Sequence, residues 1–254
     1  MSAKVLVLAG DGVNCEVETA KAFEAHGGSA HIMQLNELIS APQKLAEHDI
    51  LALPGGFSYG DEIHSGQVYA LKLKKHLFKE MQEFIKKDKL ILGVCNGFQI
   101  LVKLGFLPSP LEERSATLAG NRDGAFIDRW EELQTWDSVC VWTKNLPASL
   151  FMPARHGEGK LVFAGDEKRQ KQIYQKLKDN KQIVFTYTND INGSYGQIAG
   201  LTDPSGRVLG LMPHPEAALD EELNPFNSAT PSNMIFANAI NHSNQINKTK
   251  EGLL

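Results

Sequence analysis

A cysteine flanked by glycines is the residue in this chain best suited to nucleophilic chemistry. Cys95 lies at the centre of Gly93–Gly97, where an apolar run ends and a helical pattern begins. Glycines two positions before and after a nucleophile are typical of a sharp strand-to-helix turn, which strains the central residue and brings backbones close together. The partial positive charge at the start of the helix would favour a thiolate. The alternative interpretation is a buried structural cysteine.

A histidine and a glutamate two residues apart supply the expected base and its orienting group. Met212 and His214 each precede a proline, which favours extended backbone. Residues two apart in an extended segment point to the same side, so the carboxylate of Glu216 is expected to hold one ring nitrogen of His214. The other ring nitrogen would then face the Cys95 thiol, as in a nucleophile–base–acid triad. An exposed proline-rich turn with an incidental histidine is the alternative.

A pair of glycines after the third expected strand is suited to binding an oxyanion. Gly55 and Gly56 permit a tight loop whose amide N–H points at a developing negative charge. The amide of Asn96, directly after the nucleophile, is its expected partner. A plain glycine turn is the alternative interpretation.

The first half of the chain alternates short apolar runs with helical patterns, which predicts an α/β fold with a mostly parallel, doubly wound sheet. Ligands bind beyond the carboxyl ends of the strands in such a sheet. The expected strands are Lys4–Ala9, Ala30–Leu35, Asp49–Leu53 and Leu90–Val94, and the expected helices cover about 14–26, 67–87 and 97–104.

The second half has shorter, partly alternating runs that predict an antiparallel extension of the sheet. Its expected strands are Ala125–Trp130, Ser138–Thr143, Leu161–Ala164, Ile183–Thr188, Ile198–Thr202 and Val208–Met212, and its expected helices cover about 166–179 and 232–244. We expect one domain over residues 1–254, with its motifs in 4–218 and a helical tail in 219–254.

Composition excludes several classes of protein. The chain has 254 residues, 42% of them hydrophobic and 22% charged, which is ordinary for a globular protein and excludes disordered and collagen-like chains. The net charge of -4 argues against general binding to nucleic acid or anionic membranes. No apolar stretch approaches the roughly 18 residues of a membrane span, and no signal sequence is recognised, so a cytoplasmic location is expected.

The three cysteines, Cys15, Cys95 and Cys140, are widely spaced and include no Cys-x-x-Cys pair. The spacing predicts neither a disulfide framework nor a metal site. No phosphate-binding glycine motif follows a strand, so no nucleotide site is expected in this chain.

Taken in order, these segments resemble the class I (triad) glutamine amidotransferases. Other blocks are similar to the family of glutaminase subunits of phosphoribosylformylglycinamidine synthase, and the resemblance covers roughly residues 4–218. The matching blocks are Gly12–Glu16, Pro54–Asp61, Cys95–Gln99, Asn121–Phe126, His156–Gly159, Asn192–Ser194 and Pro213–Glu216.

The resemblance implies that the chain hydrolyses glutamine to glutamate and ammonia. The ammonia would pass to a synthetase that converts formylglycinamide ribonucleotide to formylglycinamidine ribonucleotide in de novo purine biosynthesis. It also implies that ATP and magnesium bind on that synthetase, with no cofactor in this chain, and that a small accessory subunit joins the complex.

The resemblance also assigns roles by motif position. Cys95 is the nucleophile, His214 the base and Glu216 its orienting acid. The remaining assignments are an oxyanion hole from the amides of Gly56 and Asn96, and glutamine contacts from Gln99, Gly55, Gly157 and Glu158.

Three single positions and one short stretch depart from the family pattern, namely Asp123, Ala125, Arg155 and Ile63–Ser65. They leave the triad intact and put partner contacts and the tightness of glutamine binding in doubt. Two alternatives remain: an amidotransferase that serves another synthetase, and a non-catalytic binding protein that keeps a cysteine at the same turn. A glutaminase assay in the presence of the partner distinguishes the non-catalytic hypothesis from the two amidotransferase hypotheses.

Overall fold

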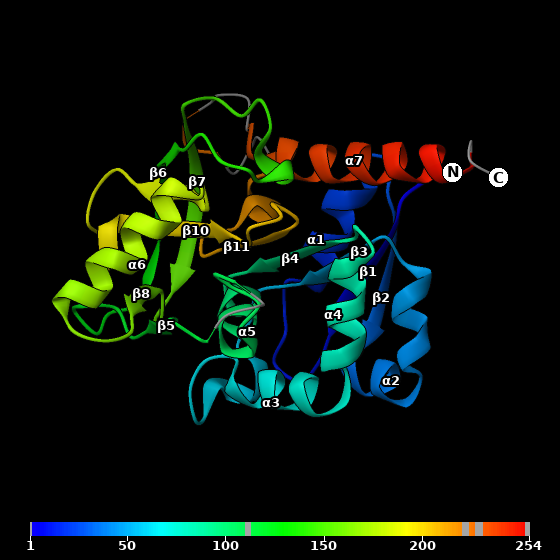
Figure 1. Cartoon of the computed structure of the whole chain (residues 1–254), viewed down its shortest axis with the longest axis horizontal. Coiled ribbons are helices and arrows are strands. Elements are labelled where there is room, and N and C mark those ends of the chain that lie inside the picture. Colours follow the sequence, from blue (N-terminus) through cyan, green and yellow to red (C-terminus); the bar gives the residue numbers. More distant parts are fainter. Residues whose placement is uncertain (1, 110–112, 220–223, 227–230, 252–254) are drawn as a thin grey trace.

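A nine-stranded mixed sheet forms the centre of the molecule (Figure 1). This computed structural model describes residues 2–109, 113–219, 224–226 and 231–251. The strand order is β2-β1-β3-β4-β11-β10-β9-β6-β7, and β5 pairs with β8 in a separate two-stranded sheet. The strands are β1 Lys4–Ala9, β2 Ser29–Gln34, β3 Ile50–Leu53, β4 Leu90–Val94, β5 Ala116–Ala119, β6 Ile127–Thr135, β7 Ser149–His156, β8 Lys160–Phe163, β9 Ile183–Tyr187, β10 Ile198–Thr202 and β11 Val208–Leu211.

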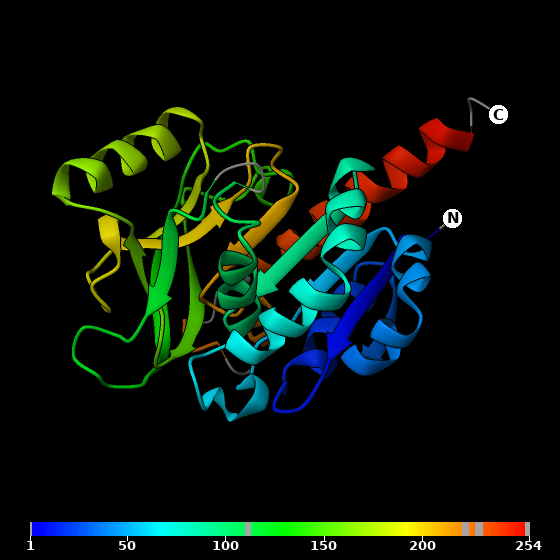
Figure 2. The ribbon, with the colours of Figure 1, turned by 60° about the horizontal axis from the view of Figure 1, so that its bottom comes forward.

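Helices cover both faces of the sheet (Figures 1 and 2). The α-helices are α1 Glu16–Glu24, α2 Leu35–Ser40, α3 Gln67–His76, α4 Phe78–Lys86, α5 Asn96–Leu104, α6 Glu167–Asp179 and α7 Met234–Glu251. The short 3-10 helices are η1 Pro42–Glu47, η2 Ser58–Asp61, η3 Val141–Thr143, η4 Tyr195–Gln197, η5 Pro215–Ala218 and η7 Pro231–Asn233.

The predicted parallel part of the sheet is confirmed. Strands β2, β1, β3, β4 and β11 run parallel to one another. Every residue of β3, β4 and β11 is buried, which explains why these strands are continuous apolar runs rather than alternating ones. Their carboxyl ends consequently meet at one edge of the sheet.

The predicted antiparallel extension is also confirmed, with two strands that the sequence interpretation missed. From β11 outward, β10, β9, β6 and β7 pair antiparallel. The missed strands are β5 and β7. Pro153 interrupts the pattern of β7, yet it is tolerated because β7 is the edge strand of the sheet and needs no second partner.

The single helix expected over 67–87 is wrong, because α3 and α4 are separate helices. Leu77 between them leaves helical geometry with φ -133° and ψ 3°. Leu77 is itself fully buried. The break lets both helices bury their own apolar faces, with Leu73 in the first and Met81 in the second.

The strand expected over Ser138–Thr143 is also wrong. The segment instead ends in η3, and its backbone amides bond to loops: Val139 N–H donates to Lys181 O and Val141 N–H to Gly206 O. Its apolar character reflects burial of Trp142, which has no exposed surface. Burial without strand pairing therefore produced a misleading pattern.

The expected C-terminal helix is present as α7 and packs on the core. Phe236 is fully buried and meets Phe23 of α1 edge-on, with ring centroids 5.0 Å apart. Residues 220–223, 227–230 and 252–254 of the expected tail lie outside the described residues. Within the described part of the chain, no helix is long and apolar enough to cross a membrane.

Candidate active site

Four neighbouring parallel strands deliver the reactive groups, three of them predicted, to one edge of the sheet. The loop with Cys15 follows β1, Gly56 follows β3, Cys95 follows β4 and His214 follows β11. Side chains that are far apart in the sequence therefore converge where α/β sheets bind ligands.

The nucleophile turn has the predicted strain. Cys95 has φ 50° and ψ -105°, a region that residues with a side chain rarely adopt. A Cβ at Gly97 would lie 1.9 Å from the carbonyl oxygen of Leu53, so no other residue fits there without movement. The turn holds the buried Cys95 thiol 3.5 Å from the backbone oxygen of Arg155.

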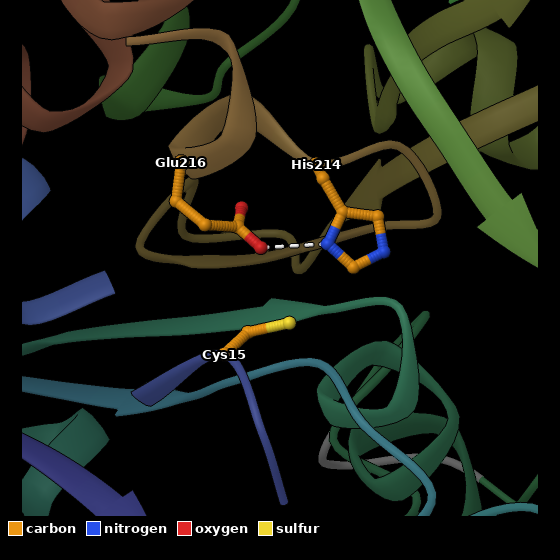
Figure 3. A group of neighbouring side chains, drawn as sticks. All are labelled: Cys15, His214 and Glu216. Carbon is orange, nitrogen blue, oxygen red and sulfur yellow. Dashed lines mark hydrogen bonds and ion pairs between the residues drawn. The ribbon is translucent and has the colours of Figure 1, made fainter. Parts of the chain in front are cut away.

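The predicted pairing of His214 with Glu216 is confirmed. His214 Nδ1 lies 2.6 Å from Glu216 Oε1, and both residues are 3% exposed (Figure 3). The expected extended course through Glu216 is wrong, because η5 begins at Pro215. His214 itself is extended, and its N–H donates to the oxygen of Pro153 at 2.8 Å. The edge strand β7 thus anchors the base.

The groups around His214 favour the protonated, positively charged form of its imidazole. Burial of the ring lowers the pKa of His214, but the Glu216 carboxylate, together with the Cys95 and Cys15 thiols, outweighs this effect, so the pKa lies well above its usual value. The Nε2 atom of His214 has no hydrogen-bond partner among the described residues. The expected hydrogen bond between this nitrogen and the Cys95 thiol is therefore not formed in this structure. Such catalytic contacts often tighten only when substrate binds.

The backbone around Gly56 is held by hydrogen bonds on both sides. Phe57 N–H donates to Gly12 O at 2.7 Å, and the N–H groups of Asn14 and Cys15 share the oxygen of Gly55. Gly56 lies between these anchors with φ 145°, and a Cβ there would meet Gly12 O at 2.6 Å. The oxyanion role of its amide stays a prediction.

The second expected donor and Gly55 have clear structural settings. Asn96 is the first residue of α5, where amide N–H groups have no partner within the helix. A Cβ at Gly55 would lie 2.6 Å from His214 Cε1, so this glycine leaves room for the imidazole. Contact of Gly55 with glutamine stays a prediction.

A closed ring of hydrogen bonds joins three segments beside the nucleophile. Asn96 Nδ2 donates to Gln99 Oε1 at 3.0 Å, and Gln99 Nε2 donates to the backbone oxygen of Glu158 at 2.7 Å. Glu158 Oε2 accepts the amide N–H of Ser65 at 3.2 Å. Asp61 completes the ring by accepting from the Ser65 hydroxyl at 2.8 Å and from Asn96 Nδ2 at 3.4 Å.

This ring, which we call the carboxylate ring (Asp61, Ser65, Asn96, Gln99 and Glu158), places two acidic groups near each other. Burial raises the pKa of Asp61, and the nearby Glu158 carboxylate raises it further, against the effect of its hydrogen bonds. A cationic group placed here would relieve the repulsion. The predicted residues Gln99 and Glu158 are thus brought together. Asp61 stood in the matching block Pro54–Asp61 and Ser65 in the departing stretch Ile63–Ser65, but the sequence assigned neither a role in the site.

His156 acts from within the fold rather than at the reacting atoms. Asn121 Oδ1 accepts the N–H of Gly159 at 3.1 Å, so the Nδ1 of His156, also 3.1 Å away, must donate to it. The Nε2 atom then faces the hydroxyl of Tyr187 at 3.3 Å. Burial, with the nearby charge of His214, lowers the pKa of His156 to about 4. The ring is therefore neutral and braces the loop that carries Glu158.

Of the departures from the family pattern, Ser65 lies in the carboxylate ring, whereas the side chains of Asp123 and Arg155 make contacts elsewhere. The side chain of Asp123 is 75% exposed. The Arg155 guanidinium is directed to Asp128, 3.5 Å away, so only its backbone oxygen meets the Cys95 thiol. Ala125 contributes its oxygen to Asn121 at 2.8 Å, which any residue could do.

Cys15 is the reactive group that the sequence patterns did not assign. Its sulfur lies beside the His214–Glu216 pair (Figure 3). Burial raises the pKa of Cys15, although its interaction with His214 acts in the opposite direction. Only its place in the block Gly12–Glu16 marked it in the sequence.

Comparison with known sequences identifies close similarities over most of the chain. A family model described as the CobB/CobQ-like glutamine amidotransferase domain matches residues 2–243. A phosphoribosylformylglycinamidine synthase subunit PurQ from Methanococcus maripaludis is 44% identical over 231 residues, covering 85% of this chain and 82% of the relative. The protein of that name from Treponema denticola is 35% identical over 238 residues, covering 85% and 88%.

Solved structures are similar as well. A structure described as PurLQS from Thermotoga maritima has a TM-score of 0.75 and 29% identity, covering 95% of this chain and 99% of the other. A glutamine amidotransferase from the same organism has a TM-score of 0.53 at 19% identity, covering 100% and 95%. The second similarity shows the fold alone.

The buried neutral His156 predicts acid sensitivity. In the unfolded chain its pKa is about 6.5, so acidification from pH 6.5 to about 4 protonates only the unfolded state and lowers stability. The loss attributable to this group is about 2 to 4 kcal/mol, at about 1.4 kcal/mol per pKa unit. Urea unfolding at pH 7 and pH 4.5 should therefore show a smaller acid-induced loss for His156→Asn than for the unmodified chain. Equal losses would contradict the assigned burial.

Proposed function

This chain belongs to the CobB/CobQ-like glutamine amidotransferase family, and we propose that it is the glutaminase subunit of phosphoribosylformylglycinamidine synthase. The observation that carries the activity is the buried Glu216–His214 pair, which reaches the same sheet edge as the strained Cys95. The assignment to this particular synthase is supported by the relatives, which are named as subunits of it.

The first half of the reaction uses the triad. The Cys95 sulfur attacks the side-chain amide carbon of glutamine, and the thiol proton resides on His214, whose charge Glu216 stabilises. The amides of Gly56 and Asn96 receive the oxyanion of the tetrahedral intermediate. The carbon–nitrogen bond then breaks, ammonia leaves with the proton from His214, and a thioester to Cys95 remains.

Water completes the reaction. His214, again neutral at Nε2, accepts a proton from water, which attacks the thioester carbon. The second tetrahedral intermediate expels the Cys95 sulfur and yields glutamate. The same oxyanion donors serve both steps, because the carbonyl carbon remains in one place.

The carboxylate ring fits the amino-acid end of glutamine. Glutamine carries an ammonium group beyond its side chain, and Asp61 with Glu158 offers two carboxylates close to the nucleophile. Charge-assisted hydrogen bonds of this kind are stronger than neutral ones. Gln99 and the backbone of Gly157 complete the proposed pocket, with Gln99 positioned one helical turn after Cys95.

Ammonia would pass to a separate synthetase, which makes formylglycinamidine ribonucleotide with ATP in purine biosynthesis. The relatives are subunits named for that synthase, and the structural neighbour is described as PurLQS. We assign ATP and magnesium to the synthetase, expect a small accessory subunit, and place the complex in the cytoplasm. The sequence relatives favour this synthase over another one, and the paired His214 and Glu216 favour catalysis over a purely binding role.

Cys95→Ala in the reconstituted complex should abolish glutamine-dependent synthesis and leave ammonia-dependent synthesis largely intact, since Cys95 acts only in releasing ammonia. Formation of the amidine product is measured with glutamine and, separately, with an ammonium salt. Failure of ammonium to rescue a complex that has assembled normally would refute the division between the two half-reactions.

Asp61→Asn should raise the KM for glutamine by at least about tenfold, because a charged hydrogen-bond acceptor worth about 1.5 to 3 kcal/mol becomes a neutral amide. The matched control is Glu62→Gln, which makes the same charge change on an exposed neighbour. Steady-state glutamate release by the complex provides the measurement. A KM that is unchanged in Asp61→Asn, or raised equally in the control, would exclude a specific role for Asp61.

A further inference from the structure

A third reactive group stands beside the catalytic pair and is neither the nucleophile nor the base of glutamine hydrolysis. Cys15 lies directly before α1 and is partly exposed. Its sulfur, one nitrogen of His214 and one carboxylate oxygen of Glu216 all lie within 4.8 Å of one another (Figure 3). The three residues arrive from two loops, after β1 and after β11.

The donor set points to a particular class of ion. A thiolate, an imidazole and a carboxylate are the usual ligands of zinc, which needs three protein ligands and accepts water as a fourth. Magnesium and calcium prefer oxygen donors and would gain little from a thiolate. The set is therefore selective against the magnesium that accompanies ATP.

We propose that Cys15, His214 and Glu216 form a binding site for Zn²⁺ or a similar thiophilic divalent cation, and that occupation of this site switches off the glutaminase. The inhibitory consequence rests on the proposed function, whereas the metal site itself does not.

The geometry needs only small movements. Tetrahedral zinc with ligand distances of about 2.0 to 2.3 Å places its ligand atoms roughly 3.3 to 3.7 Å apart. His214 Nδ1 and Glu216 Oε1, now 2.6 Å apart, must separate by somewhat under about 1 Å. The Cys15 sulfur must approach by roughly 1 Å, and it gives up only a hydrogen bond of 3.3 Å to Asn14 Oδ1.

One unpartnered atom supports the presence of a ligand here. Glu216 Oε2 is buried and has no hydrogen-bond partner among the described residues. Buried polar atoms of native proteins are normally paired, and exceptions call for an explanation. Glu216 could thus bind a cation through either oxygen, while the exposed part of Cys15 provides the route of entry.

Binding of zinc requires only the loss of protons from the ligands and no change of oxidation state. The Cys15 thiol and the Nδ1 of protonated His214 each lose a proton to solvent, and their lone pairs bind the cation. The imidazole then keeps its remaining proton on Nε2. A ring with zinc on Nδ1 and a proton on Nε2 cannot accept the proton of the Cys95 thiol, so hydrolysis stops.

Binding of Zn²⁺ to the full chain tests the site directly. Calorimetric titration should give one tight site in the unmodified chain and in Cys95→Ser, with proton release seen as a dependence on buffer ionisation enthalpy. Cys15→Ser should weaken binding at least about tenfold, because loss of even an outer contact costs a metal site about 10- to 100-fold. Unchanged affinity in Cys15→Ser, or a loss confined to Cys95→Ser, would overturn the proposal. Thermal melts of both variants verify folding.

Glutamate release by the assembled complex tests the consequence. Zinc should inhibit the unmodified complex and chelation should restore it. Cys15→Ser, compared with its own zinc-free rate, should need at least about tenfold more zinc for equal fractional inhibition. Excess magnesium should not protect. Equal inhibition of both complexes would overturn the switch. A chain that binds zinc through Cys15 but never hydrolyses glutamine would instead disprove the proposed function and leave the metal site standing.

Discussion

The buried contact between Glu216 and His214 is the interaction on which the active site depends. A carboxylate and an imidazole with almost no exposed surface would each be costly to bury alone, and together they stabilise a charged ring. That stabilisation is what glutamine hydrolysis requires at the moment the Cys95 proton is transferred. The rest of the site supplies the strained turn, the space and the proposed substrate contacts around this pair.

The two halves of the sheet contribute different things to that pair. The parallel half brings Cys95, Gly56 and His214 to one edge by ending adjacent strands there. The antiparallel half supplies the supporting backbone, through the oxygens of Pro153 and Arg155 on the edge strand β7.

Short sequence patterns correctly predicted the features that depend on only a few neighbouring residues. The glycines around Cys95 and the prolines around His214 act within a few residues, and the strained turn and the paired base followed from them. The carboxylate ring and the position of Cys15 depend on which loops meet at the sheet edge, and no short pattern encodes that meeting. Misassigned elements have the same origin, since Trp142 is buried by tertiary packing and Pro153 is tolerated only because its strand lies at an edge.

The central claim is that Glu216 makes His214 an effective base for Cys95, and single-turnover acylation tests it most directly. Labelled glutamine is mixed rapidly with excess assembled complex, and the label bound covalently to Cys95 is followed in the unmodified enzyme and in Glu216→Gln. The account predicts that acylation slows by at least about a hundredfold in a variant that remains folded, because a neutral amide cannot stabilise the imidazolium as a carboxylate does. An unchanged acylation rate would contradict it and would reduce Glu216 to a structural residue of the turn.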